Sequence, residues 1–277
     1  MRRLLTANFR RLWRDRYFWW VLAFVGVFSL ANIINSASSW AVMTEQGYIR
    51  TLDDYYFNQA PIMGGFFGIF VSVFLGTEYA DGVIRNKLVI GHKREHIYIG
   101  NFLVCSAASL MFLAVWLLVE ALGIFLIGPF EMGLADYVLF AAAACGIAIA
   151  FSALYTLIGS LLSNKAMTVV YTILAFFANA IVASGFYDRL SEPEFEEGMM
   201  LVDGQLVMLE PTPNPLYLSG TTRLLCQYAM ELIPGGQSLL LSNVSMENQV
   251  RAILLSAVFT VVFLGIGCML FRRKDIK

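Results

Sequence analysis

The sequence of 277 residues has few charged side chains: Asp, Glu, Lys and Arg together make up 14% of it, against about 25% in an average soluble domain. Apolar residues make up 58%, and the mean hydropathy is +0.69. A chain this poor in charge lacks the polar surface of an ordinary soluble domain, so these values exclude that class and indicate a membrane protein. We expect the lipid bilayer as a partner and no nucleic acid.

Sequences that bind nucleotides or form disulfides are also missing. The phosphate-binding pattern G-x-x-x-x-G-K-[ST] is absent, and no Gly-Lys pair occurs, so any ATP and Mg must be bound by another subunit. Four scattered cysteines exclude a disulfide framework, and two histidines exclude most His/Cys metal sites. We therefore expect no cofactor, no metal and no catalytic residue in this chain, which would not itself be an enzyme.

Long apolar runs, in contrast, are abundant. A bilayer core of about 30 Å takes roughly 20 helical residues to cross, and six runs of about that length occur. The prediction is an all-α polytopic membrane protein in which residues 1–277 form one transmembrane domain. The six spans lie at about 17–39, 61–77, 98–128, 138–162, 166–185 and 251–271.

The positions of lysine and arginine orient these spans. Of the 19 basic residues, 15 lie before span 1, between spans 2 and 3, between spans 4 and 5, or after span 6, and 4 lie in the alternate connections. Because basic residues are retained on the cytoplasmic side, both termini are predicted to be cytoplasmic in a bacterial plasma (inner) membrane. A cleaved signal peptide is the rival interpretation of the N-terminus, but its loss would leave five spans and break this pattern.

Two segments outside the spans carry structure of their own. Residues 1–16 place apolar and arginine side chains on opposite helical faces, which favours an interfacial helix on anionic headgroups. Residues 186–250 read as an acidic exterior loop of mixed α/β structure. A β-hairpin is predicted there at Asp203-Gly204, followed by a helix over 220–233 and a break at 234–236 that returns the chain to span 6.

Two ionisable features could take part in chemistry or transport. Glu120 is the one ionisable residue that we place deep in a span, where a carboxylate needs a polar partner or water. Its role is either a structural hydrogen bond or a substrate or gating contact, and the pathway candidates are Glu120, Asn32, Asn35 and Asn179. The segment His92-Lys93-Arg94-Glu95-His96 fits the H-x-x-E-H pattern of inverted zinc proteases, but a third ligand is needed on the same side of the membrane.

The segment that follows span 2, GTEYADGVIRNKLVIGHKREHIYIGNF, resembles the first cytoplasmic loop of type-2 ABC transporter permeases, a class of exporters with six spans per subunit. Shorter stretches along the rest of the chain, such as Ser163-Asn164-Lys165 and Asn214-Pro215-Leu216-Tyr217, also resemble this family. Val83 stands where the family usually has Thr. The residues that carry the first-loop resemblance are Glu78, Tyr79, Gly82, Ile84, Arg85, Asn86, Lys87, Leu88, Gly91, Arg94, Ile97 and Tyr98.

The resemblance implies that residues 78–97 hold a coupling helix that docks on a separate ABC ATPase subunit, itself a dimer, and that two permease subunits, identical or related, form the pathway. Val83, Ile84, Leu88 and Ile90 would offer apolar anchors, and the nearby cations would steer toward an acidic rim. Glu78 and Arg85 would pair within the loop. The resemblance also suggests a peptide, lantibiotic-like or other amphipathic substrate.

Two alternatives from other classes stay open: an intramembrane zinc metalloenzyme that uses residues 92–96, and a proton-coupled secondary transporter that uses Glu120. The first predicts stoichiometric bound zinc, and the second predicts transport by this chain alone under a pH gradient. The coupling residues that the resemblance implies are Glu78, Tyr79, Gly82, Val83, Ile84, Arg85, Lys87, Leu88 and Arg94.

Overall fold

A computed structural model describes residues 1–45, 51–196, 199–202, 205–208 and 210–275. Within these residues, six helices are long and apolar enough to cross a membrane. They match the six predicted spans to within a few residues at most ends, so the prediction of a mainly helical chain with six long apolar helices is confirmed. These helices are α2 (Arg16–Glu45), α4 (Ala60–Ala80), α6 (Arg94–Glu120), α7 (Leu134–Leu161), α8 (Lys165–Ser191) and α11 (Gln249–Arg273).

Shorter helices connect or flank the six long ones. The N-terminal segment forms a helix that ends at Arg14, as its amphipathic pattern predicts, and the predicted helix over 220–233 is present as α9. Three short elements, α3, η1 and α10, are not anticipated by the sequence reading. The short helices are α1 (Arg2–Arg14), α3 (Asp53–Tyr56), α5 (Val83–Val89), η1 (Ala121–Phe125), α9 (Gly220–Leu232) and α10 (Pro234–Ser242).

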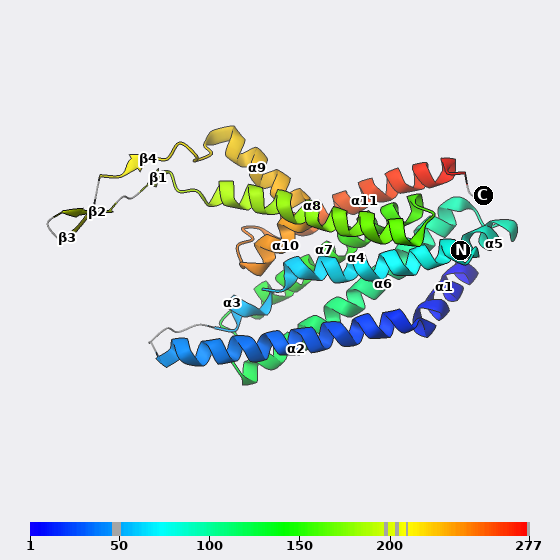
Figure 1. The fold of residues 1–277 in the computed structure, drawn as a ribbon, viewed down its shortest axis with the longest axis horizontal. Coiled ribbons are helices and arrows are strands. Elements are labelled where there is room, and N and C mark those ends of the chain that lie inside the picture. The colour runs from blue at the N-terminus through cyan, green and yellow to red at the C-terminus, as the bar shows by residue number, and fades with distance from the viewer. Residues whose placement is uncertain (46–50, 197–198, 203–204, 209, 276–277) are drawn as a thin grey trace.

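The long helices run side by side, and the chain termini lie at the same end of the bundle (Figure 1). We call this the α5 end; it comprises residues 2–14, 78–97, 161–166 and 271–275. The α3 and α9 helices and the strands lie toward the opposite end, which we call the β end (Figure 1). Six long helices, an even number, are consistent with both ends of the chain lying together, as the distribution of basic residues predicts.

The β end carries a pair of two-stranded antiparallel sheets. Strands β1 (Phe195–Glu196) and β4 (Thr212–Pro213) pair with Phe195 opposite Pro213. Strands β2 (Met199–Val202) and β3 (Gln205–Met208) pair with Val202 opposite Gln205. The second pairing is the predicted β-hairpin, and its turn pair, Asp203-Gly204, lies outside the described residues.

The interior is packed by aromatic rings and by small residues. Phe18 of α2, Phe70 of α4 and Phe112 of α6 are buried, with ring centroids 5.3–5.9 Å apart. On α7, Gly159 lies so close to Leu75 that an added Cβ would come within 2.8 Å of a side-chain carbon. Because lipid tails are as apolar as the helices, close packing of this kind, rather than the hydrophobic effect, holds the spans together.

Two local predictions are corrected by the structure. The expected break at residues 234–236 is instead the first turn of α10, because Pro234 fits the first position of a helix, where its missing N–H leaves no intrahelical hydrogen bond unmade. Glu78, expected in an exposed loop, lies in α4 and is fully buried. The loop between α4 and α6 therefore begins after Ala80.

Candidate functional site

The side chain of Glu78 is the centre of a polar network at the α5 end. Its Oε1 lies 2.5 Å from Arg11 Nη1 of α1 and 2.5 Å from Lys87 Nζ of α5. Asn101 of α6 donates from Nδ2 to Glu78 Oε2 at 2.7 Å, and Asn8 of α1 donates to Asn101 Oδ1 at 3.0 Å. One carboxylate thus joins α4 to three other helices.

This network compensates for the burial of a charge. Glu78 is 0% exposed, and removing a carboxylate from water costs several kcal/mol unless it is paired and hydrogen-bonded. Arg11 is also held in place by a hydrogen bond of 2.6 Å from Nη2 to the carbonyl of Phe74 and by its position over the Phe74 ring. The expected Glu78–Arg85 pair is therefore wrong: Glu78 pairs with Arg11 and Lys87, and Arg85 faces outward, exposed.

Two glycines define the ends of α5. Gly82 has φ +65° and precedes the helix, and Gly91 has φ +93° and follows it. The N–H of Gly91 donates to the carbonyl of Leu88 at 2.9 Å, and that of His92 donates to the carbonyl of Lys87 at 3.1 Å. This pair of bonds is the Schellman arrangement, which needs a left-handed residue that glycine adopts without strain.

The two faces of α5 differ from the expected ones. Ile84 is buried, and Leu88 packs beside it against a cluster that includes Tyr98 and Phe271. These two residues anchor α5 to the bundle and are not free to anchor a partner. Of the expected anchors, Ile90 is exposed, at 76%, and Val89, which is not among them, is 81% exposed.

The C-terminal end of α11 closes the same end of the bundle. Arg94 donates from Nη1 to the carbonyls of Phe271 and Lys274. Lys274 Nζ donates to the carbonyl of Ser160 at 3.0 Å and lies 4.0 Å from the centroid of the Tyr79 ring, and Tyr79 donates to the same carbonyl. Burial lowers the pKa of Lys274 to about 8.

Glu120, at the last turn of α6, forms a second polar centre. It is 1% exposed and accepts hydrogen bonds from Gln59 Nε2 and, at 3.2 Å, from Trp116 Nε1. Asn32 lies beside the same carboxylate, and its Nδ2 donates to Asn58 Oδ1 at 3.2 Å. The Ser29 hydroxyl donates to Gln59 Oε1 at 3.3 Å, which continues the network into α2. Glu120 is thus tied to α2 and to the N-terminal cap of α4.

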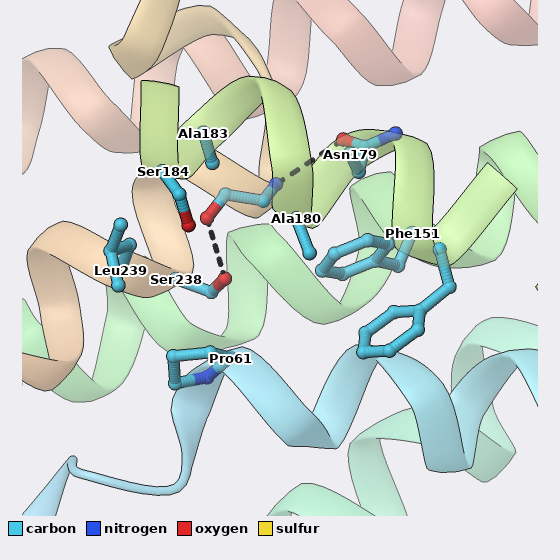
Figure 2. A pocket seen from close by; sticks show the side chains of 10 residues that line it. Pro61, Phe151, Asn179, Ala180, Ala183, Ser184, Ser238 and Leu239 are labelled. Carbon is cyan, nitrogen blue, oxygen red and sulfur yellow. Dashed lines mark hydrogen bonds between the residues drawn. The ribbon is translucent and has the colours of Figure 1, made fainter. Parts of the chain in front are cut away.

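The other two pathway candidates lie elsewhere. Asn35 is exposed, and its carbonyl accepts bonds from the hydroxyls of Ser38 and Ser39. Asn179 of α8 lines a cavity of about 50 Å³ at the junction with α10, where its Oδ1 accepts from the N–H of Gly235 at 3.4 Å (Figure 2). The structure brings Asn32 to Glu120 but leaves Asn35 and Asn179 outside the bonds that hold that carboxylate.

The close fit at Gly235 explains the sequence Pro-Gly-Gly at the start of α10. A Cβ at Gly235 would meet the backbone oxygen of Asn179 at 2.8 Å, and one at Gly236 would overlap the backbone of Met230. The cavity is walled on its other sides by Pro61 and Phe151 (Figure 2). With room for little more than a water molecule or two, it is a packing defect between helices and too small to be a substrate pathway.

Several residues of these networks are not predicted from the sequence. Asn8, Arg11 and Asn101 surround Glu78, and Gln59 holds Glu120. Asn101 carried a usable signal, because an amide inside an apolar run needs a partner. Arg11 carried none, since it sits among five other arginines between residues 2 and 16.

The H-K-R-E-H segment, residues 92–96, spans the end of the loop and the first turn of α6. No group of three or more His, Cys, Asp or Glu side chains that could hold a metal is found among the described residues. Glu95 pairs with Arg272 at 3.0 Å. The geometry thus offers the two histidines no third ligand in the described part of the chain.

Comparison with known proteins gives no assignment: no protein-family model matches the chain, and no curated protein is significantly similar to it.

Proposed function

We propose that the chain is the membrane-spanning permease subunit of an ATP-driven exporter of the type-2 ABC class, acting as a dimer and powered by a separate ATPase. In this proposal the α5 end, where the basic residues gather, is cytoplasmic, α1 lies on the inner face of the membrane, and the β end is exterior. The substrate is an amphipathic compound such as a peptide or a lantibiotic-like antibiotic.

The construction of α5 is the observation that supports this proposal most directly. A subunit moved by an ATPase needs a surface element that offers contacts outward and is fixed firmly inward. The last residue of α5, Val89, and its C-cap, Ile90, are exposed to solvent, whereas Ile84 and the Lys87–Glu78 pair fix the helix to the bundle. A small apolar face beside exposed Arg85 suits a groove with an acidic rim.

The Glu78 network suggests how such a docking event would be transmitted. A push on α5 would reach α4 through Lys87 and Ile84, and it would reach α1 and α6 through Arg11 and Asn101. Packed helices with a fixed polar link move as rigid bodies more readily than they deform. Alternating access by rocking of helices fits this arrangement.

The proposal is tested by removing the exposed face of α5. We expect an ATPase chain to copurify with wild type from native membranes. The double variant Val89→Ser/Ile90→Ser should fold normally, because both side chains are exposed, and should lose that ATPase chain. The control is Leu134→Ser at the first residue of α7, which removes an apolar side chain that is 79% exposed at the other end of the span.

Retention of the ATPase by the α5 variant would contradict the docking assignment. Equal loss from the Leu134→Ser control would also contradict it, since the loss would then not depend on α5. The exporter proposal as a whole would be removed if no ATP-hydrolysing partner copurifies with the wild-type chain.

A proton-coupled transporter is the second candidate, and it is favoured by one observation: a carboxylate, Glu120, is buried in a span among neutral polar groups from α2, α4 and α6. This function predicts efflux by the chain alone in vesicles that carry a pH gradient and contain no ATPase. Absence of such flux together with ATP-dependent export by the complex would exclude it.

A further inference from the structure

A second cavity lies at the β end, between the C-terminal part of α8, helix α9 and the end of α10. Its volume is about 230 Å³, less than the roughly 300–1,000 Å³ of sites for drug-sized ligands. The residues that matter to its chemistry are Arg223, Gln227, Met230, Glu231 and Glu247. It is separate from Glu78, from Glu120 and from the small cavity at Asn179.

Glu231 gives this cavity a buried negative charge that is only partly satisfied. The residue is 6% exposed, and its Oε1 pairs with Arg251. Its Oε2 is buried and has no hydrogen-bond partner among the described residues. An ionised oxygen left in this way costs free energy that a donor in the cavity would recover.

Arg223 gives the other end of the cavity a positive charge, and this charge is also only partly hydrogen-bonded. Its Nη2 donates to the carbonyl of Leu190 at 2.8 Å, and the guanidinium lies 5.0 Å from the centroid of the Tyr217 ring. These contacts hold the side chain in one position. Its Nη1 is buried and unpaired among the described residues, so the two N–H groups of that nitrogen remain for an anion.

The separation of the two charges follows from their places on α9. They are eight residues apart on one helix, which at about 1.5 Å per residue sets their backbones roughly 12 Å apart along the axis. Gln227 lies midway and donates to Glu247 Oε2 at 2.7 Å. Met230 is buried and lines the same cavity, so an apolar wall joins the two charged ends.

We propose that this cavity binds a short zwitterionic chain, with its ammonium at Glu231 and its carboxylate at Arg223. Three extended residues span at most about 10–11 Å, close to the backbone spacing of Arg223 and Glu231 on α9, so we choose a tripeptide or a peptide-like segment of that length as the ligand. A single amino acid, whose charges are adjacent, reaches one end only. Binding supplies the hydrogen bonds that Glu231 Oε2 and Arg223 Nη1 lack.

The test uses the purified full chain in detergent and isothermal titration calorimetry with trialanine. We expect saturable binding, weakened at least about tenfold by N-acetylation of the peptide and at least about tenfold by C-terminal amidation, since each blocks one charge-assisted contact worth roughly 1.5 kcal/mol or more. Equal affinity for the free and blocked peptides, or no binding of trialanine, would overturn the proposal.

Variants of Glu231 and Arg223 then show which end of the peptide each residue binds. In Glu231→Gln, N-acetylation should no longer matter while amidation still does, and Arg223→Gln should show the reverse. Asp188→Asn and Arg189→Gln, at exposed positions on the adjacent part of α8, are the matched controls and should bind as wild type does. A control that loses binding as strongly as Glu231→Gln would contradict the site.

The site would deepen the proposed exporter function by describing part of its substrate, but the binding test does not depend on that function. It requires no ATPase, no nucleotide and no membrane. Binding of trialanine without a copurifying ATPase would support the site and remove the exporter proposal. A copurifying ATPase without binding of trialanine would remove the site and leave the exporter proposal.

Discussion

Substituting Glu78 by Gln tests whether the polar network at the α5 end holds the helices together. The change keeps the size of the side chain and removes its charge. Glu78 contacts Arg11 and Lys87 at 2.5 Å each and accepts from Asn101 at 2.7 Å. Loss of one partner from a buried ion pair costs about 3–5 kcal/mol.

The lower part of this range applies because the partners keep some contact with solvent. The Arg11 side chain is 25% exposed and that of Lys87 is 11% exposed, while Glu78 is 0% exposed. Both cations recover part of their hydration when the carboxylate is neutral, and the glutamine oxygen can still accept from Asn101. We therefore expect Glu78→Gln to lower the free energy of unfolding by about 3 kcal/mol.

The matched control is Glu95→Gln at the same end of the bundle. Glu95 pairs with Arg272 at 3.0 Å, but the two side chains are 41% and 64% exposed, so the same substitution should cost less than about 1 kcal/mol. The assay is equilibrium unfolding by SDS in mixed micelles, followed by helical circular dichroism. If the two variants unfold within about 1 kcal/mol of each other, the network does not stabilise the bundle as we argue.

A double-variant cycle separates the network from an effect of Glu78 alone. Arg11→Gln removes one of the two cations, and its effect should overlap with that of Glu78→Gln because both break the same contact. The double variant should therefore lose less stability than the sum of the two single variants. Strict additivity would mean that the Arg11–Glu78 contact contributes nothing measurable.

Three further predictions follow from the structure. Gly82→Ala and Gly91→Ala should each lower the free energy of unfolding by roughly 1–2 kcal/mol in the same SDS titration, because their φ angles of +65° and +93° strain alanine. The control is Gly185→Ala, at an ordinary φ with open space around an added methyl group, which should leave stability unchanged. Equal effects at the three positions would refute the reasoning. Glu120→Gln should preserve expression and assembly while changing efflux of an amphipathic peptide, measured in cells with matched protein levels; normal export would remove its functional role. The pKa of Lys274 is about 8 in the folded chain against 10.5 for a free lysine, so between pH 8 and 10.5 the unfolded chain binds more protons and stability should rise with pH. The melting temperature of Lys274→Met should rise less across this window than that of wild type. Parallel curves of melting temperature against pH for the two proteins would contradict the prediction.

The spans could be predicted from sequence because the requirement behind them is local. A helix that crosses lipid must be apolar over about 20 successive residues, and that length is visible in the chain without knowledge of any contact. The hairpin at 199–208 was visible for a similar reason, since a turn pair between two β-prone runs acts over a few residues. Both features depend on neighbours in sequence.

The polar networks were not predictable to the same degree. Which residue faces Glu120 depends on the rotation and tilt of each helix, which packing sets and composition does not. Asn179 was therefore a reasonable partner by depth, yet it faces Gly235 of α10. Arg11 looked like one more interfacial cation, and only the packing of α1 against α6 and α4 turns it toward Glu78.

Ile84 and Leu88 show a further limit. Short helices with apolar residues among cations have two possible uses for those residues, inward packing or outward docking, and the pattern alone does not separate them. The structure assigns Ile84 to the interior and leaves Val89 and Ile90 outside. The sequence had placed Ile90 correctly among the exposed side chains and had overlooked Val89.

Because Glu78 holds Arg11 of α1 and Lys87 of α5 through one carboxylate oxygen, the two surface helices share a single thermodynamic linkage. If α1 binds anionic headgroups, as proposed, and this binding shifts the position of α5, then docking of a protein on α5 must change the affinity of α1 for those headgroups by the same factor. In the proposed exporter, the lipid composition under α1 would then modulate docking of the ATPase on α5, and depletion of anionic lipid would have the same effect as a weakened ATPase contact.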